Sequence, residues 1–217
     1  MLVVVLAIAL TILLLRDGEV PRVVLLPANT SLAPKRLAFD GWVPMSWAWY
    51  WRTKDFVLGH SRSVVIDATV ASFPAQGVLP SFPPAIKSIT NLHIYFVRTN
   101  EAVRMRQELT SSGGSYSTAC RITTAHGIHT RMVSASGQPT SPSFSLEVLA
   151  RQRGDCTDLL TSIEATGFGT GITTAITNLA MAARIQIPKE HALFILKTTE
   201  RTGDPATLGV ILTPKWK

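Results

Sequence analysis

The sequence predicts an α+β fold that is mainly antiparallel β, with one short helix packed on the sheet and an N-terminal membrane-anchor helix ahead of it. Strand-like runs separated by short turn signals recur over residues 60–217, which is typical of antiparallel β domains. An apolar run over Met1–Leu15 predicts the anchor. A connector rich in Pro and Trp lies between them. We therefore expect three parts, over residues 1–15, 16–59 and 60–217.

The composition favours an ordered protein and argues against a nucleic-acid binder. Hydrophobic residues make up 46% of the 217 residues and charged residues 16%, so the chain has enough apolar surface to form a core. The net charge of +7 favours anionic surfaces. The basic residues are scattered along the chain, whereas a nucleic-acid binder usually concentrates them on one stripe. Nucleic acid is therefore not an expected partner.

The anchor is short, and its flanks bear on its orientation. A helix over Met1–Leu15 reaches about 22 Å, less than the ~30 Å hydrocarbon core. The polar stretch Arg16–Glu19 follows at once, in place of a small-residue cleavage site, so we expect an uncleaved anchor. Arg16 and Arg22 follow the run and no basic residue precedes it. The positive-inside rule then favours a cytoplasmic main domain.

The connector concentrates aromatic residues next to basic ones. Four of the five Trp residues lie in it, namely Trp42, Trp47, Trp49 and Trp51. Pro44 and Gly59 suit the start and the end of a helix, so we expect one from about Pro44 to Leu58. Trp concentrates at membrane–water interfaces, which predicts these four as membrane-interface residues. Packing of the same rings against the β domain is the alternative.

Alternating or continuous apolar runs predict the strands of the β domain. They are expected at Ser63–Phe73, Asn91–Thr99, Tyr116–Ala125, Ile128–Ser134, Ser143–Arg151, Thr157–Ala165, Ala183–Ile187, Ala192–Lys197 and Thr207–Leu212. Asn100 is a suitable N-cap for a short helix that runs to Leu109. The composition of Ile172–Ala182 is also compatible with a helix.

Two strand boundaries carry predictions of their own. A structural turn at His126 and Gly127 should join two strands into a hairpin, because Gly supplies the positive φ that such a turn needs. The last strand, Thr207–Leu212, has apolar residues on both faces. We expect it to be buried on two sides, either inside the sheet or at a seam between subunits. Pro214 should end its pairing because proline has no N–H.

The only two cysteines, Cys120 and Cys156, leave two interpretations open. In an oxidising compartment they could form a disulfide that closes a loop of about 37 residues and stabilises the fold by ~3 kcal/mol. The alternative is two separate buried thiols, because free Cys behaves as a small hydrophobic residue.

No motif in the chain predicts a catalytic, cofactor or metal site. His126 and His129 lie across a turn without nearby carboxylates in the sequence, whereas a zinc site needs several converging ligands. The stretch Gly59–Ser63 imitates a nucleophile elbow but lacks its closing Gly. Asp155 and Asp158 flank a turn, where carboxylates usually solvate a loop. We therefore expect a non-enzymatic protein without cofactors.

Several segments resemble the core module of bacterial secretins. The helix after Asn100, the segment Arg121–Thr124, the turn at His126-Gly127 and the ending Leu212–Pro214 occur in the family's order. The resemblance covers about residues 90–214, and its segments are short. Cys120 stands where many family members have Pro, and the chain has no room for the family's upstream ring-forming domains. A reduced or accessory relative is what this resemblance implies.

The resemblance and the anchor together predict a membrane-anchored envelope protein that helps to assemble a secretion or pilus-type apparatus. Its expected partners are the membrane, further copies of itself and secretion-system proteins. The implied location is the bacterial inner membrane, crossed once, with the main domain in the periplasm; the basic flank of the anchor favours the cytoplasmic side instead. The alternative functions are an anchored periplasmic hydrolase and a ligand-binding domain.

Overall fold

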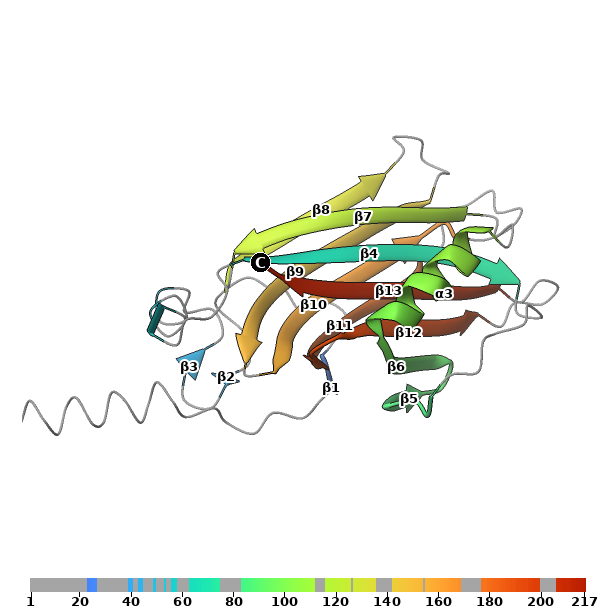
Figure 1. Ribbon diagram of the computed structural model, residues 1–217. Helices are drawn as coiled ribbons and strands as arrows, with labels where there is room; N and C mark the ends of the chain where they lie inside the picture. The colour runs from blue at the N-terminus through green and yellow to red at the C-terminus, as the bar shows by residue number, and fades with distance from the viewer. Residues whose placement is uncertain are drawn as a thin grey trace, which may run out of the picture.

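Two antiparallel sheets face each other across one apolar interior (Figure 1). The computed structural model describes residues 23–26, 39–40, 43–44, 49, 53, 56–57, 63–74, 83–111, 116–125, 127–135, 142–153, 155–168, 177–199 and 206–217. Its elements are β1 (Val23–Leu26), β2 (Phe39–Asp40), β3 (Val43–Pro44), β4 (Ser63–Pro74), β5 (Lys87–Ile89), β6 (Leu92–Arg98), α3 (Thr99–Ser111), β7 (Tyr116–Ala125), β8 (His129–Ala135), β9 (Ser143–Arg153), β10 (Cys156–Thr166), β11 (Thr177–Pro188), β12 (His191–Thr199) and β13 (Ala206–Trp216). The predicted antiparallel β fold with a packed helix is confirmed, and the expected anchor over Met1–Leu15 lies outside the described residues.

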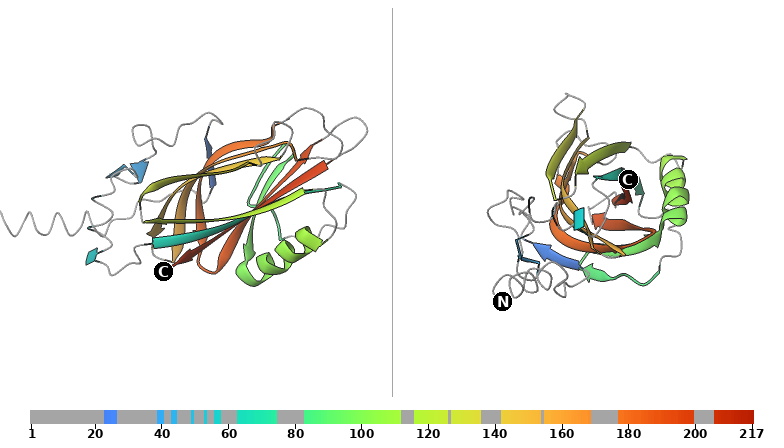
Figure 2. Two further views of the ribbon diagram at one scale, coloured as in Figure 1. Left: turned by 90° about the horizontal axis from the view of Figure 1, so that it is seen from above. Right: turned by 60° about the vertical axis from the view of Figure 1, so that its left-hand side comes forward.

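The chain crosses between the two large sheets at two tight turns. The five-stranded sheet has the order β1-β11-β10-β9-β8, and the six-stranded sheet has the order β5-β6-β12-β13-β4-β7. The chain passes from the six-stranded to the five-stranded sheet between β7 and β8, and it returns between β11 and β12. Figure 2 shows the strands of one sheet crossing those of the other, with both sheets curving round the shared interior. The fold is therefore a β-sandwich.

Every second residue of the paired strands faces the interior. Leu146 and Val148 of β9 meet Val210 and Leu212 of β13 in one cluster, and all four are fully buried. Successive side chains of a strand point to opposite faces, so this alternation gives each sheet one apolar face. Burial of these two faces stabilises the sandwich by about 1.5–3 kcal/mol for each large aliphatic side chain.

The helix α3 covers the outer face of the six-stranded sheet. Ala102 and Met105 pack against Tyr95, Phe194 and Ile211, which point outward from β6, β12 and β13. The helix occupies the predicted region, but Asn100 lies inside its first turn and is not its N-cap. The start is fixed instead by Glu101, whose carboxylate accepts a hydrogen bond from the backbone N–H of Arg98 at 3.2 Å. Where α3 lies on it, over β6, β12 and β13, the outer face of this sheet is a second buried layer.

The last strand, β13, lies between β12 and β4, so its expected burial on two sides is confirmed. The expected end of its pairing at Pro214 is wrong, because the pairing with β4 continues to Trp216. The N–H of Lys217 donates to the carbonyl of Ser63, on the β4 side. N–H groups alternate between the two sides of a strand, so the nitrogen of Pro214 points away from β4. Pairing on that side, with β12, has already ended at Leu212.

The segment Ile172–Ala182, considered for a helix, is a strand where the structure describes it. There β11 begins at Thr177 and pairs with β10 on one side and β1 on the other. Leu179 and Met181 alternate into the core. Ala and Leu favour helices only weakly, and pairing with β10 overrides that preference.

The turn between β7 and β8 has the predicted backbone. Gly127 has a φ of 67°. The N–H of Ile128 donates to the carbonyl of Ala125 at 3.1 Å, which closes the turn. The positive-φ position predicted for Gly127 is therefore confirmed, and His126 lies outside the described residues.

Candidate functional site

Large apolar side chains are exposed in the Trp-rich connector. Trp49, Thr53, Phe56 and Val57 are helical, and the hydroxyl of Thr53 donates to the carbonyl of Trp49 at 2.9 Å. Trp49 is 65% exposed, Phe56 72% and Val57 59%. Their spacing places them on one side of a helix. We call Trp49, Phe56 and Val57 the apolar stripe.

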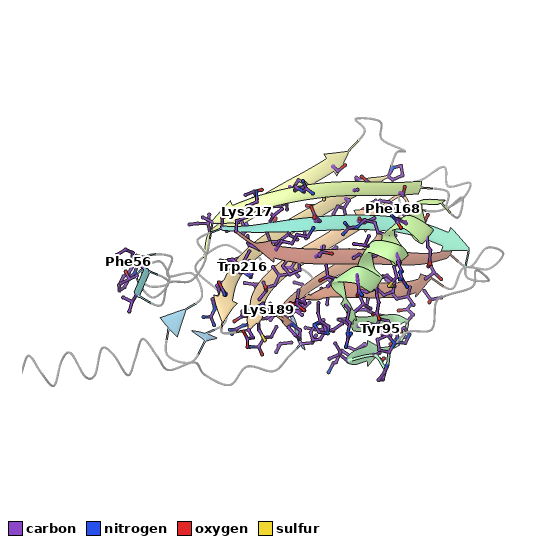
Figure 3. The ribbon with its side chains drawn as sticks, viewed as in Figure 1. Phe56, Tyr95, Phe168, Lys189, Trp216 and Lys217 are labelled. Carbon is purple, nitrogen blue, oxygen red and sulfur yellow. The ribbon has the colours of Figure 1, made fainter. Side chains whose placement is uncertain are left out.

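The apolar stripe includes one of the four predicted membrane-interface residues. Trp42, Trp47 and Trp51 lie outside the described residues. Phe56 lies apart from the two sheets, beyond the end of the sandwich where Trp216 and Lys217 lie (Figure 3). Sequence reasoning missed Phe56 and Val57, although their helical spacing from Trp49 could have revealed them. None of the helices that the structure describes is long and apolar enough to cross a membrane.

The strands β7 and β8 form one flank of the sandwich, but the hairpin expected there is wrong, because the turn carries the chain from one sheet to the other. Among the described strands, β7 pairs only with β4 and β8 pairs only with β9. Hydroxyl contacts cross from one strand to the other, with Thr130 Oγ1 2.7 Å from Thr124 Oγ1 and Thr118 Oγ1 3.5 Å from Ser134 Oγ. Both strands are thus sheet edges in the described part of the chain, and such edges can pair with another chain.

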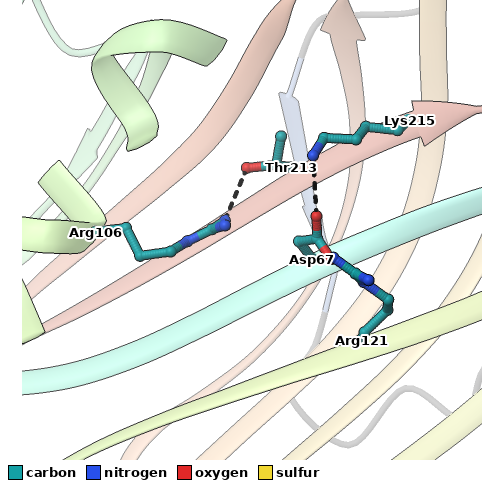
Figure 4. Close-up of polar contacts among 5 residues, drawn as sticks. All are labelled: Asp67, Arg106, Arg121, Thr213 and Lys215. Atoms are coloured by element: carbon teal, nitrogen blue, oxygen red, sulfur yellow. Dashed lines mark hydrogen bonds and ion pairs between the residues drawn. The ribbon is translucent and has the colours of Figure 1, made fainter. Parts of the chain in front are cut away.

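A cationic cluster surrounds Asp67 on the outer face of the six-stranded sheet (Figure 4). The Asp67 carboxylate accepts hydrogen bonds from Arg121 Nε at 2.6 Å and from Lys215 Nζ at 3.2 Å. Arg106 of α3 donates to Thr213 Oγ1 at 3.2 Å beside them. Burial of Asp67 opposes its ionisation, but the hydrogen bonds from Arg121 and Lys215 outweigh it and hold its pKa below the ordinary value. This cluster ties β7, β4 and β13 together.

A second ionic cluster lies on the outer face of the five-stranded sheet. Asp158 is fully buried and accepts hydrogen bonds from Arg151 Nη2 at 2.9 Å and from Arg184 Nη2 at 2.7 Å. Burial again opposes ionisation, but these hydrogen bonds and the two positive charges hold the pKa of Asp158 below its ordinary value. The three residues come from neighbouring strands β9, β10 and β11, so the cluster fixes their register.

A cavity of about 430 Å³ opens where two turns meet the end of β13. The turn between β9 and β10 and the turn between β11 and β12 form part of its wall. Trp216, Pro188 and Pro214 give it apolar surface, and Gln152 and His191 add polar groups. We call this cavity the turn pocket. From the sequence, Trp216 was recognisable only as the one Trp outside the connector. Its place in a pocket could not be predicted, because the pocket is formed by turns that are far apart in the chain.

Cys120 and Cys156 are not joined to each other in the structure, so the disulfide that the sequence left open is not formed. Cys120 lies on β7 and Cys156 begins β10, in different sheets. Burial, together with the nearby charge of Asp67, raises the pKa of Cys120 to about 11. The thiol of Cys120 is therefore protonated at neutral pH and is a poor nucleophile.

No metal centre is visible in the described part of the chain, where no group of three His, Cys, Asp or Glu side chains could hold an ion. His129, one of the two histidines weighed as ligands, lies 3.4 Å from a carboxylate oxygen of Glu147 across β8 and β9. Asp155 and Asp158, which flank one turn, are separated by the fold: the first is exposed and lines the turn pocket, and the second is in the buried cluster.

Comparison with protein-family models, with curated proteins and with solved structures found no match to this chain. The functional assignment therefore rests on the residues and geometry of the chain itself.

Proposed function

We propose that this protein is a non-enzymatic, membrane-anchored envelope protein of secretin-like type, whose β-sandwich takes part in assembling a secretion or pilus-type apparatus. It would sit in the bacterial inner membrane through Met1–Leu15, with the sandwich in the periplasm. Two kinds of contact would serve this function: insertion of the apolar stripe at the membrane surface, and pairing at the edges of the sandwich.

The exposed apolar stripe carries the proposal. Soluble proteins rarely leave neighbouring large apolar side chains this exposed without a binding partner. A membrane surface suits Trp49 because its ring is both apolar and polar, and Arg52 and Lys54 in the same stretch of sequence suit anionic headgroups. Moving Trp49, Phe56 and Val57 out of water would stabilise the attachment by roughly 1–2 kcal/mol for each side chain.

The strand edges support the assembly half of the proposal. On β7, the outward residues Ser117, Ala119 and Thr123 are small and exposed, and on β8 Val133 is 55% exposed. A strand from a second copy or from an apparatus protein could pair with such an edge through its backbone, and the small side chains would not obstruct it. The other candidate for a subunit seam, β13, is enclosed between β12 and β4 and is not accessible.

Lipid contact by the stripe can be measured with a fluorescent label at Thr53. The full chain, with both cysteines replaced by Ser and Thr53→Cys carrying a polarity-sensitive fluorophore, is reconstituted into anionic vesicles that contain bromine-labelled lipid. We expect a blue shift and quenching by the bromine, because Thr53 lies beside the stripe. Arg104→Cys, exposed on α3, is the matched control and should show neither change. Equal behaviour of the two labels would refute the interfacial role.

The topology is tested by a reporter that is active only in the periplasm, fused after Lys217. Activity is expected if Met1–Leu15 holds the sandwich outside the cytoplasm. A silent reporter on a normally expressed fusion would place the domain in the cytoplasm, as the basic residues after the apolar run favour.

A ligand-binding domain is the second candidate function, and the turn pocket is the observation that favours it. Its volume of about 430 Å³ is in the range of small-molecule sites. The anchored hydrolase has no comparable support among the described residues.

A further inference from the structure

Backbone hydrogen bonds hold the walls of the turn pocket in place. The N–H of Lys189 donates to the carbonyl of Asp155 at 2.7 Å, which joins the β11–β12 turn to the β9–β10 turn. The N–H of Thr99 donates to the carbonyl of Glu190 at 2.9 Å, which joins the β11–β12 turn to the start of α3. These bonds form without a ligand, so binding would not require the walls to become ordered.

The charges around the pocket balance. Lys189 and Lys215 line it together with Asp155 and Glu190. Lys215 also donates to the Asp67 carboxylate at 3.2 Å, and this carboxylate partly neutralises its positive charge. An anion would meet two carboxylates, and a cation would meet two ammonium groups. The pocket therefore favours a neutral ligand over an ion of either sign.

The uncharged groups of the pocket both donate and accept hydrogen bonds. His191 Nδ1 lies 2.9 Å from the carbonyl oxygen of Lys189, which only accepts, so Nδ1 carries the proton and Nε2 of the neutral ring is an acceptor. The side-chain amide of Gln152, on the same lining, carries both donor and acceptor groups. The hydroxyl of Thr157 accepts from Trp216 Nε1 at 2.8 Å and retains its own proton as a donor. Hydroxyl groups on a ligand match these donors and acceptors, because each hydroxyl can both donate and accept a hydrogen bond.

The apolar part of the pocket suits a ring. Trp216 is held in one orientation by its hydrogen bond to Thr157, and Pro188 and Pro214 lie on the same lining. Sugar rings combine hydroxyl groups at their edges with C–H faces that stack on aromatic rings. We propose that the turn pocket binds a neutral saccharide. This binding is a further activity that does not depend on membrane attachment or on assembly.

The Trp216 indole N–H provides a direct measurement. The ¹⁵N-labelled full chain is studied in a detergent without a sugar headgroup, and Trp216→Phe identifies the Trp216 signal among those of the five Trp residues. Cellobiose, maltose and diacetylchitobiose are titrated separately to about 20 mM, which would detect dissociation constants weaker than millimolar. We expect at least one of them to shift the Trp216 signal saturably and to leave the Trp49 signal unchanged.

Variants separate specific binding from a general effect. Gln152→Ala and His191→Ala should each weaken the binding by about tenfold, because each removes hydrogen bonds to the sugar. Gln107→Ala, the same substitution at an exposed position of α3, should leave it unchanged. Circular dichroism checks that each variant is folded. If only one of the two pocket variants folds, that variant is enough to test the proposal.

Three results would overturn the proposal. The first is no saturable shift with any of the three sugars. The second is saturation by sodium phosphate or sodium glutamate in place of the sugars, which would make the pocket an ion site. The third is sugar binding that is equally strong in the folded pocket variants. None of them bears on the lipid contact of the apolar stripe, which has its own label and control.

Discussion

The buried carboxylate of Asp158 is a single group on which the stability of the fold depends. It is fully buried on the outer face of the five-stranded sheet, and its two arginine partners are 1% and 4% exposed in their side chains. Such a cluster is stable only while the charges are paired, because an unpaired charge in the interior has lost its hydration. Removal of the carboxylate would leave Arg151 and Arg184 facing each other.

Asp158→Asn should lower the free energy of unfolding by about 3–5 kcal/mol at pH 7. The folded pKa of Asp158 is lowered, so its contribution is complete above the unfolded pKa of roughly 3.9 and is lost as the pH falls through the folded value. The difference between wild type and variant should therefore shrink only below about pH 4. Urea unfolding between pH 2 and 7 measures it.

Asp155→Asn, three residues earlier and exposed, is the matched control and should change stability by less than about 0.5 kcal/mol. A loss as small as this in Asp158→Asn would contradict the role assigned to the buried cluster.

Two tight turns are important for the fold, because each carries the chain from one sheet to the other. Gly127 in the β7–β8 turn has a φ of 67°, and Glu190 in the β11–β12 turn has a φ of 62°. A side chain with a Cβ is strained in this region, and glycine is not. The same backbone geometry is therefore occupied by a favourable residue at one turn and by an unfavourable one at the other.

Gly127→Val should destabilise the protein by about 1–2 kcal/mol or more, because a β-branched side chain is disfavoured at positive φ. Glu190→Gly should instead stabilise it by up to about 1 kcal/mol, since the strain is released while the carbonyl of Glu190 still accepts from Thr99. Thermal unfolding of the two variants measures both signs. Loss of stability in both would show that the Glu190 side chain contributes more than its backbone strain removes.

In the molecule taken as a whole, β13 lies inside its sheet, whereas β7 and β8 lie at the edges of the two sheets. Val210 of β13 is fully buried, between β12 and β4 and facing the five-stranded sheet. Val133 of β8 is 55% exposed at a sheet edge. Substitution by Asp at each of these two positions, in separate variants, therefore distinguishes an effect on folding from an effect on assembly.

Val210→Asp should abolish folding, because a carboxylate without a partner would be buried, and this penalty is comparable with the roughly 5–15 kcal/mol that stabilises a domain. Val133→Asp should fold normally and lose any self-association, because like charges would meet at the paired edges. Circular dichroism reports folding and light scattering in detergent reports association. A wild-type protein that is monodisperse and monomeric at high concentration would remove the assembly proposal and leave the ligand-binding domain as the better account.

The local elements follow from patterns between residues close together in the sequence. Tyr116–Ala125 is a strand with the predicted boundaries, and the positive φ of Gly127 and the helix after β6 were also predictable. Strand alternation and turn chemistry act between residues close in the chain, so a local pattern records them. Of the apolar stripe, only Trp49 was predicted, because it belongs to a run of aromatic residues in the sequence.

How these elements meet could not be predicted from the sequence and is visible in the three-dimensional fold alone. It made Thr177–Ala182 a strand that pairs with β10, extended β13 past Pro214, and kept Cys120 and Cys156 in different sheets. It also joined Asp67 to Lys215, and it brought Gln152, His191 and Trp216 to one pocket. These residues come from strands far apart in the chain. Their partners depend on sheet order and register, which are set by burial of the whole core and by no local signal.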